Sequence, residues 1–197
     1  MNEQNLNEKQ KVNWLREIIP YVVILGVVLM LRIFVIVNAY IPSESMESTI
    51  MTGSRVLGLK SAYWFSEPER GDIAVFWAPD EPDTLYVKRV IGLPGDTVEI
   101  KSVTYTDEDG DEGIKAVVYV NGEELQEDYL NEEMEPEDAG PYVVPEDCYF
   151  MLGDNRNYSL DARYWTNTYV SKDAIVGKVY LEYWKTPQWL ASTPDYE

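Results

Sequence analysis

The chain contains no histidine, yet it carries serines and a lysine in settings that suit nucleophilic chemistry. Ser43 and Ser45 lie in residues 41–46, directly after the only long apolar run, and Lys88 lies in the apolar residues 85–91. A serine hydroxyl becomes a strong nucleophile only when a base takes its proton, and the common triads use histidine for this step. A neutral lysine amine can replace histidine when burial lowers its pKa from about 10.4 toward neutrality. Any serine nucleophile here must therefore rely on a base such as lysine.

The segment around Lys88 predicts a β-strand. Alternation places Lys88 on the same face as Tyr86 and Val90, which would flank its aliphatic stem. Taken alone, the segment fits a surface lysine on an edge strand better, because lysines are rarely buried. Ser45 alone fits a turn serine that hydrogen-bonds the backbone. The local residues leave both roles open.

A polar block begins at Gly153, immediately after an apolar run. Polar groups that enter a core need partners. Ser159 in this block can hydrogen-bond a lysine amine and hold it in place. Two pairs of opposite charge can instead form buried ion pairs that fix a loop: Asp161 with Arg163, and Asp154 with Arg156. Physical arguments alone do not choose between these roles.

The overall composition excludes several classes of function. A net charge of −19 argues against a nucleic-acid partner, because phosphate binding draws on clustered lysines and arginines. The single Cys148 cannot form an internal disulfide, and no histidine or paired cysteines suggest a zinc or iron–sulfur site. No metal and no cofactor are expected.

The long apolar run, residues 18–37, has about the length that a helix needs to cross a hydrocarbon core of roughly 30 Å. Basic residues precede it and none follows the run until Arg55, so the positive-inside bias predicts a cytoplasmic N-terminus. A cleaved signal peptide would have a shorter apolar core and an A-x-A exit, so we interpret the run as an uncleaved anchor. Because Arg32 is costly at mid-bilayer, we expect the span to end near Leu31 and residues 33–37 to form a strand.

The remainder of the chain predicts an antiparallel all-β domain with one short helix after Ser45. Short apolar runs alternate with turn residues, and Asn121-Gly122 is a strong hairpin signal. No long stretch outside the anchor has the period of a helix. The predicted strands are residues 54–59, 72–77, 85–91, 97–100, 116–120, 148–152 and 174–182.

Acidic residues crowd together between Asp107 and Asp147, with Lys115 as the only basic residue among them. Such a run is typical of a solvated face or mobile loop, and we favour this reading over a specific cation site. It is interpreted as an insertion at about residues 101–147 that decorates the main sheet. The fold class expected is mainly β, an antiparallel sheet with a small inserted subdomain, preceded by one transmembrane helix.

Several sequence blocks occur together in the order of one known family. They are P-S-x-S-M at residues 42–46, G-D-I/V-x-V-F at 71–76, Y-x-K-R-x-x-G-L-P-G-D at 86–96 and G-D-N-R-x-x-S-x-D-x-R at 153–163. With the preceding anchor, these blocks resemble the type I signal peptidases, membrane-bound serine proteases that use a Ser-Lys dyad. The single anchor and short insertion are more similar to the enzymes of Gram-positive bacteria than to the larger two-span forms.

The resemblance implies a role for each matching residue. Ser45 corresponds to the nucleophile and Lys88 to the general base, while Ser43 contributes to the oxyanion hole and Ser159 orients the lysine. The substrate pockets would be lined by Ile41, Pro42, Met46, Tyr86 and Val87. The structural residues near the site would be Gly153, which leaves room beside the lysine, and the ion pair of Asp161 with Arg163.

The resemblance also implies the reaction and its setting. A membrane-bound endopeptidase would remove signal peptides from exported preproteins, cleaving after small residues in an A-x-A pattern through an acyl-enzyme. Its partners would be signal peptides and the lipid bilayer, with the secretion translocon as a candidate. Residues 1–16 would be cytoplasmic, 17–37 the anchor and 38–197 the extracytoplasmic catalytic domain.

Two alternatives deserve comparison with this reading. A Ser-Lys self-cleaving regulator shares the dyad, but such proteins carry a DNA-binding module and lack an anchor. A catalytically inactive, membrane-anchored β-domain that binds exported chains is the non-enzyme alternative. The presence of Ser43, Ser45, Lys88 and Ser159 argues against it.

Overall fold

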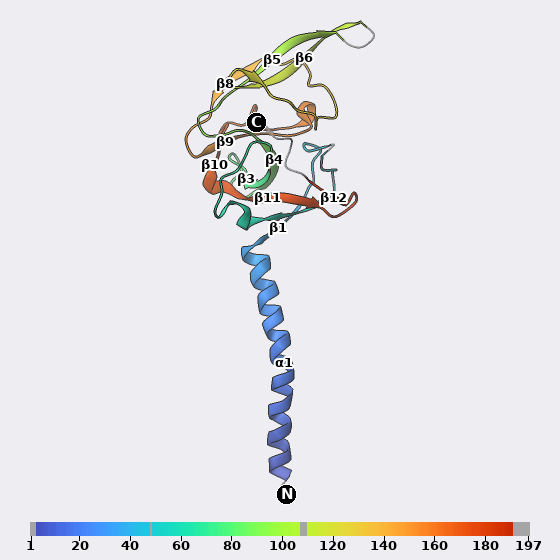
Figure 1. Ribbon diagram of the computed structural model, residues 1–197, viewed down its shortest axis with the longest axis vertical. Coiled ribbons are helices and arrows are strands. Elements are labelled where there is room, and N and C mark those ends of the chain that lie inside the picture. The colour runs from blue at the N-terminus through green and yellow to red at the C-terminus, as the bar shows by residue number, and fades with distance from the viewer. Residues whose placement is uncertain (1–2, 48, 107–109, 191–197) are drawn as a thin grey trace. The chain divides into compact units, whose positions relative to one another are not determined.

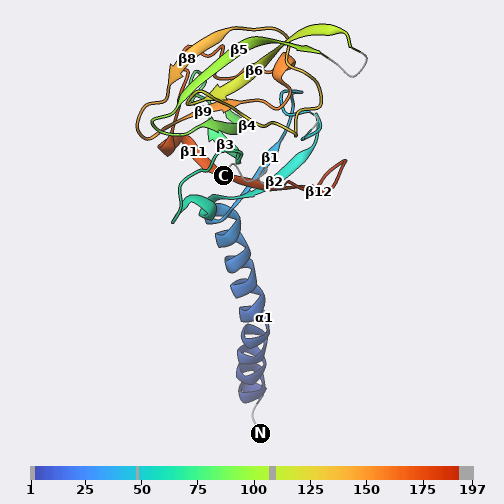
Figure 2. The same ribbon diagram turned by 45° about the horizontal axis from the view of Figure 1, so that its top comes forward.

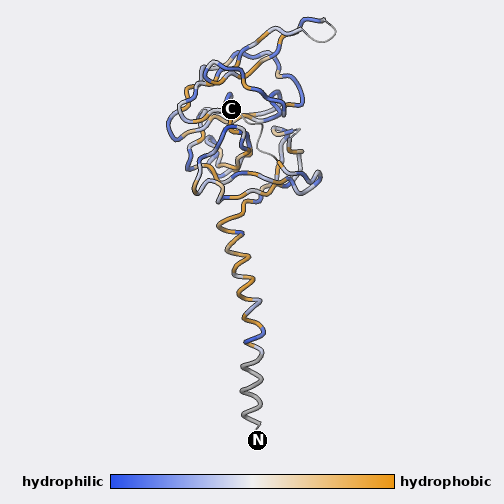
Figure 3. Tube along the Cα trace, in the orientation of Figure 1, coloured by the Kyte–Doolittle hydropathy of each residue, from blue (hydrophilic) through white to orange (hydrophobic). Residues whose placement is uncertain are grey.

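The computed structural model describes residues 3–47, 49–106 and 110–190, with side chains described from residue 14 onward. The chain divides into two compact units, Met1–Ile36 and Val37–Glu197 (Figure 1). The first unit is the helix α1, Glu3–Phe34. Its segment Trp14–Phe34 has 21 residues, is apolar and is long enough to cross a membrane (Figure 3).

The helix extends further than the sequence predicted. Residues 33–37 were expected to form a strand, but α1 continues through Phe34 and the strand β1, Ile36–Tyr40, begins two residues later. The amide of Val35 still donates to the carbonyl of Leu31 at 2.9 Å, which completes the last helical turn. A continuous helix satisfies its own backbone groups, and this outweighs the β-propensity of the branched side chains.

The second unit contains two antiparallel sheets, which confirms the predicted mainly β fold. The larger sheet has the strand order β1-β2-β11-β3-β4-β9-β10, with β12 paired to β11. After β1, its strands are β2 (Arg55–Leu59), β3 (Ile73–Trp77), β4 (Leu85–Gly92), β9 (Cys148–Leu152), β10 (Val170–Ser171), β11 (Ile175–Glu182) and β12 (Gln188–Trp189). Short 3-10 helices occur at η1 (Lys60–Tyr63), η2 (Arg156–Tyr158) and η3 (Lys172–Ala174).

The smaller sheet has the order β7-β6-β5-β8 and lies above the larger one in the view of Figure 2. Its strands are β5 (Thr97–Thr106), β6 (Glu112–Val120), β7 (Glu123–Glu124) and β8 (Ala139–Val143). The predicted hairpin is present: Asn121 and Gly122 join β6 to β7 with φ values of 55° and 86°, as a type I′ turn requires. β5 and β6 are longer than predicted because their outer ends alternate polar and apolar residues rather than forming apolar runs.

The larger sheet is covered on both faces by apolar side chains. One cluster packs Phe76 and Val90 of the larger sheet against Val98 and Val118 of the smaller one. The other cluster includes Val75, Val87, Ile41 and Met46. Ile41 and Met46 are 4% and 1% exposed, so burial anchors both ends of the segment that carries Ser43 and Ser45.

Candidate active site

Lys88 lies inside the protein, with only 3% of the residue exposed. Its Nζ donates a hydrogen bond to Ser159 Oγ at 3.0 Å. Burial lowers the pKa of Lys88 to about 8; the carboxylates of Asp161 and Asp154 oppose this shift, and Arg163 adds to it. The surface-lysine interpretation of the local segment is therefore wrong, and a neutral amine is accessible near physiological pH.

Ser45 lies on the same cleft as Lys88. The residue is 8% exposed, and its Oγ lies 3.3 Å from Ser43 Oγ. A cavity of about 710 Å³ is lined by both serines, by Lys88 and by all five residues expected to form substrate pockets, Ile41, Pro42, Met46, Tyr86 and Val87. Within the described residues Lys88 Nζ bonds Ser159 rather than Ser45. Catalytic hydrogen bonds often tighten only when substrate binds.

The segment after Ser45 forms hydrogen-bonded turns in its described part rather than the short helix that the sequence predicted. The amide of Glu47 donates to the Glu44 carbonyl at 2.9 Å, and the amide of Ile50 donates to the Met46 carbonyl at 2.8 Å. These turns fix the backbone on both sides of Ser45.

Two strand edges border the cleft. β4 pairs with β3 from Leu85 onward, but its pairing with β9 begins only at Arg89. Within the described part of the chain, no strand therefore pairs with the second side of residues 85–88. β1 is the terminal strand of the larger sheet. Residues of β1 and of this part of β4 both line the cleft, which can therefore accept an extended peptide by strand addition.

The loop that begins at Gly153 supports both candidate catalytic residues. The amide of Asn155 donates to the Ser45 carbonyl at 3.1 Å, and Ser159 accepts the bond from Lys88. A Cβ at Gly153 would lie 2.2 Å from Ser159 Oγ and 2.4 Å from the Ser45 carbonyl oxygen. Glycine is thus required, but the space beside it is taken by Ser159 and by the backbone of Ser45 rather than by the lysine itself.

The predicted pair of Asp161 and Arg163 is present, with Arg163 Nε 2.8 Å from Asp161 Oδ1. Asp161 Oδ2 also accepts the amide of Gly153 at 3.0 Å. Arg163 donates in addition to the carbonyl of Arg156 at 2.7 Å. The pair therefore closes the loop at its base and holds its first residue in place.

Asp154 does not pair with Arg156, the other arrangement that the sequence left open. Its carboxylate accepts two hydrogen bonds from Arg89, at 2.7 Å from Nε and 2.6 Å from the terminal nitrogen. Thr49 Oγ1 donates to the same carboxylate at 2.5 Å. Asp154 thus connects the segment after Ser45, the strand that carries Lys88 and the loop that carries Ser159.

Sequence reasoning missed Arg89 as part of this site and offered Arg156, not Arg89, as the partner of Asp154. The available signal was a second charge beside Lys88 inside an otherwise apolar strand. Arg89 is 1% exposed and Asp154 4% exposed, so each charge requires the other.

Substituting Asp154 with asparagine should strongly destabilise the fold. The change leaves the buried guanidinium of Arg89 without its counter-charge, and we expect the free energy of unfolding to fall by about 3–5 kcal/mol. Urea denaturation followed by tryptophan fluorescence measures this loss. Glu99→Gln, at the exposed Lys101–Glu99 pair, is the matched control and should cost under about 1 kcal/mol. Equal small losses in both variants would contradict the structural role of Asp154.

The acidic run is less solvated than the sequence suggested. Glu127 pairs with Arg156 at 2.5 Å, and Glu137 pairs with Arg163 at 2.9 Å. Both arginine side chains are 2% exposed. The interpretation as a solvated face or mobile loop is therefore wrong for Glu127 and Glu137, because their partners lie in the loop beside Lys88, far away in sequence. Among the residues described, no group of three or more Cys, Asp and Glu side chains is placed to hold a metal ion.

Comparison with known proteins finds similarity to one family. The family "Signal peptidase, peptidase S26" matches residues 12–184. A probable signal peptidase I-2 of Synechocystis is 37% identical over 85% of this chain and 72% of its own length. A signal peptidase I of Bacillus licheniformis is 35% identical over 82% of this chain and 83% of its own length. A crystal structure of a signal peptidase I from Enterococcus faecalis is 34% identical and covers 57% of this chain and 97% of that chain, with a TM-score of 0.43. The chain belongs to the signal peptidase family, peptidase S26.

Proposed function

We propose that this protein removes signal peptides from exported preproteins, with Ser45 as nucleophile and Lys88 as general base. The observation that carries the proposal is the buried amine of Lys88, whose pKa is lowered to about 8, on the same cleft as Ser45. An amine with this pKa is partly neutral at physiological pH and can accept a proton. The family match to peptidase S26 and the named signal peptidases among its relatives support the same activity.

The reaction proceeds in two steps. In acylation, neutral Lys88 takes the proton of Ser45 Oγ, which attacks the scissile carbonyl carbon. The charge that develops on the carbonyl oxygen is stabilised by Ser43 Oγ and the Ser45 amide. The protonated lysine then gives its proton to the leaving amine as the C–N bond breaks. In deacylation, Lys88 deprotonates a water molecule that attacks the ester carbonyl carbon. The protonated amine then returns the proton to Ser45 Oγ as the ester C–O bond breaks, and the signal peptide leaves with a free carboxylate.

Ser159 holds the lysine for these transfers. Its hydroxyl accepts a hydrogen bond from Nζ at 3.0 Å and so fixes the direction of the amine. It leaves the remaining positions of the nitrogen for Ser45 and the substrate. Fixing the donor and acceptor in advance contributes to catalysis because no reorientation is needed during the reaction.

The substrate binds as an extended strand between β1 and the free side of β4. Ile41, Pro42, Met46, Tyr86 and Val87 line the cleft and form shallow apolar pockets for small side chains before the cleaved bond. We expect this arrangement to favour an A-x-A sequence at the cleavage site, with small side chains packed against Ile41, Met46 and Val87.

The setting is the outer face of the cytoplasmic membrane. The helix segment Trp14–Phe34 serves as the anchor, and the basic residues before it place residues 1–16 in the cytoplasm and the catalytic domain outside. Phe65 and Trp189 of the catalytic domain are 97% and 78% exposed, and such aromatic side chains favour the interface of a bilayer. Signal peptides would reach this site as they leave the secretion translocon.

The test is cleavage of a preprotein with an A-x-A site by the detergent-solubilised enzyme. We expect the peptide bond directly after the second alanine to be cleaved, and cleavage to be lost when that alanine is replaced by leucine. Failure of the wild-type protein to cut any such preprotein, with binding retained, would favour an inactive scaffold. Cleavage of the leucine substrate at the wild-type rate would contradict the proposed small-residue pockets.

A further inference from the structure

Tyr129 lies in the acidic run, yet its ring contacts Arg89 of the buried Arg89–Asp154 ion pair. We call residues 124–138, which run from the last residue of β7 to the residue before β8, the acidic arm. Arg89 lies over the Tyr129 ring, with its guanidinium carbon 3.9 Å from the ring centroid. The Tyr129 hydroxyl donates to Glu127 at 2.5 Å and accepts a hydrogen bond from Arg156 at 3.2 Å. Tyr129 therefore contacts arginines from two of the sequence blocks that form the site.

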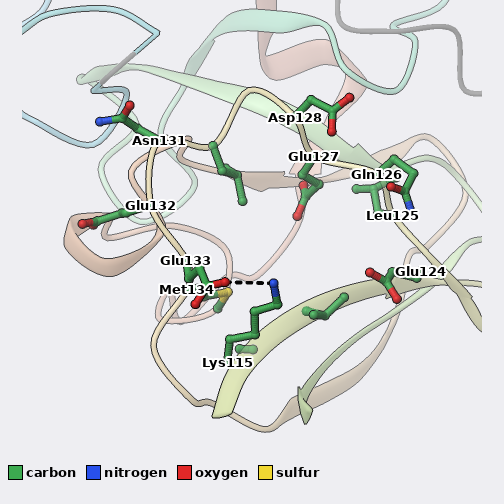
Figure 4. Close-up of a pocket in the computed structure, with 13 residues that line it drawn as sticks. Lys115, Glu124, Leu125, Gln126, Glu127, Asp128, Asn131, Glu132, Glu133 and Met134 are labelled. Carbon is green, nitrogen blue, oxygen red and sulfur yellow. Dashed lines mark hydrogen bonds and ion pairs between the residues drawn. The ribbon is translucent and has the colours of Figure 1, made fainter. Parts of the chain in front are cut away.

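The neighbours of Tyr129 hold its ring in this position. Figure 4 shows part of the acidic arm, where it borders a pocket with Lys115, and Glu127 and Asp128 point to opposite sides of the arm. Glu127 points inward, with a side chain 8% exposed, and pairs with Arg156. Burial raises the pKa of Tyr129 well above its ordinary value, so the phenol stays protonated and continues to donate to Glu127.

The contact with Arg89 extends to the catalytic residues. Arg89 binds both carboxylate oxygens of Asp154 and donates to the Gly71 carbonyl at 2.7 Å. Asp154 is adjacent to Gly153, whose position leaves room for Ser159 Oγ and the Ser45 carbonyl. A displaced Arg89 would allow Asp154 to move, and the loop that orders Ser159 and Ser45 would move with it. Displacements of about 1 Å can reduce a catalysed rate about 100-fold.

We propose that Tyr129 is a positioning residue for catalysis, acting through Arg89 and Asp154 on the loop that holds Lys88 and Ser45. The aromatic ring of Tyr129, rather than its hydroxyl, produces this effect, because the ring face covers the guanidinium of Arg89 and keeps water away from the ion pair. The acidic arm is then part of the catalytic apparatus rather than decoration of the sheet. This inference rests on the proposed function.

The test compares three substitutions at one position in the full-length, detergent-solubilised enzyme. Tyr129→Phe keeps the ring over Arg89 and should retain kcat within about 3-fold. Tyr129→Met fills a similar space without an aromatic face, and Tyr129→Leu leaves part of the space empty. We expect kcat to fall about 10-fold or more in the Met and Leu variants, with KM changed by less than about 2-fold.

The pH profile separates positioning from general loss of stability. The charged groups that act on Lys88 are Asp161, Asp154 and Arg163. Without the ring, water enters beside Asp154 and the carboxylate is less completely neutralised by Arg89. Both changes favour the protonated amine, so the acidic limb of the kcat/KM profile should move to higher pH in Tyr129→Met but not in Tyr129→Phe.

The control is Tyr119→Leu, which removes the ring that contacts Lys101 at 5.3 Å on the smaller sheet. It should leave kcat and the pH profile unchanged. The proposal is overturned if Tyr129→Met retains the wild-type kcat and pH midpoint, even when its melting temperature falls. It is also overturned if Phe and Met lose activity equally. If Tyr129→Leu does not fold, the comparison of Phe with Met still decides. Failure of the proposed function would be separate, because the wild-type enzyme would then not cleave preproteins.

Discussion

Lys88→Met should reduce preprotein cleavage by at least about 1,000-fold while leaving the fold intact. Methionine fills the space of the lysine stem but offers no amine, so Ser45 loses the base that takes its proton. The variant should be as stable as wild type or more stable, because burial opposes the charged form of Lys88. Gel analysis of preprotein cleavage, together with thermal unfolding, measures both effects.

The matched control for this prediction is Lys101→Met, which removes an exposed lysine of the smaller sheet. It should cleave at the wild-type rate. Ser45→Ala should be as inactive as Lys88→Met, and the double variant should be no worse, because the two residues act in one step. Cleavage by Lys88→Met within about 10-fold of wild type would show that another group activates the serine.

The second large effect is expected for Gly153→Ala. The added methyl group would lie 2.2 Å from Ser159 Oγ and 2.4 Å from the Ser45 carbonyl oxygen, distances that real Cβ atoms do not show. Ser159 can rotate away only by releasing Lys88, and the Ser45 carbonyl belongs to the backbone beside the nucleophile. We therefore expect kcat to fall at least about 100-fold, since misplacement on this scale is sufficient.

Gly26→Ala provides the same chemical change without the clash, because among the described residues no atom outside the adjacent helix backbone lies within 4 Å of a Cβ at Gly26. It should leave the rate unchanged, measured alongside Gly153→Ala with one preprotein. Thermal unfolding of both variants shows whether lost activity reflects lost structure. A fully active Gly153→Ala would mean that the loop is not held as closely to Ser45 as the structure indicates.

Much of the fold was accessible from the sequence because it depends on local patterns. The apolar strand containing Lys88 and the Asn121-Gly122 hairpin both occur where the sequence placed them. β8 was not predicted, because it is a short, largely exposed strand whose apolar residues are interrupted by Gly140-Pro141. β10 and β12 have two residues each, too few to show a period.

The partners of charged residues were the least predictable part of the site. The pair of Asp161 and Arg163 lies within one turn of chain and could be proposed from spacing. Arg89 and Asp154 are 65 residues apart, and Glu127 and Arg156 are 29 apart. Only the folded chain brings such residues together, so a local reading assigned the glutamates to solvent. The same limit applied to Lys88, whose local strand gave no sign of the loop that supplies its hydrogen-bond partner Ser159.

The pH dependence of preprotein cleavage tests the central claim most directly. The amine of Lys88 acts as a base only when neutral, and its pKa is lowered to about 8. The kcat/KM of the wild-type enzyme should therefore rise about 10-fold per pH unit below this value and level off above it. A midpoint near pH 8 that moves upward in Tyr129→Met would support a buried lysine base held by its surroundings. A profile that stays flat from about pH 6 to about pH 9 would contradict it, because a base with a pKa of about 8 changes its protonation state between these two pH values.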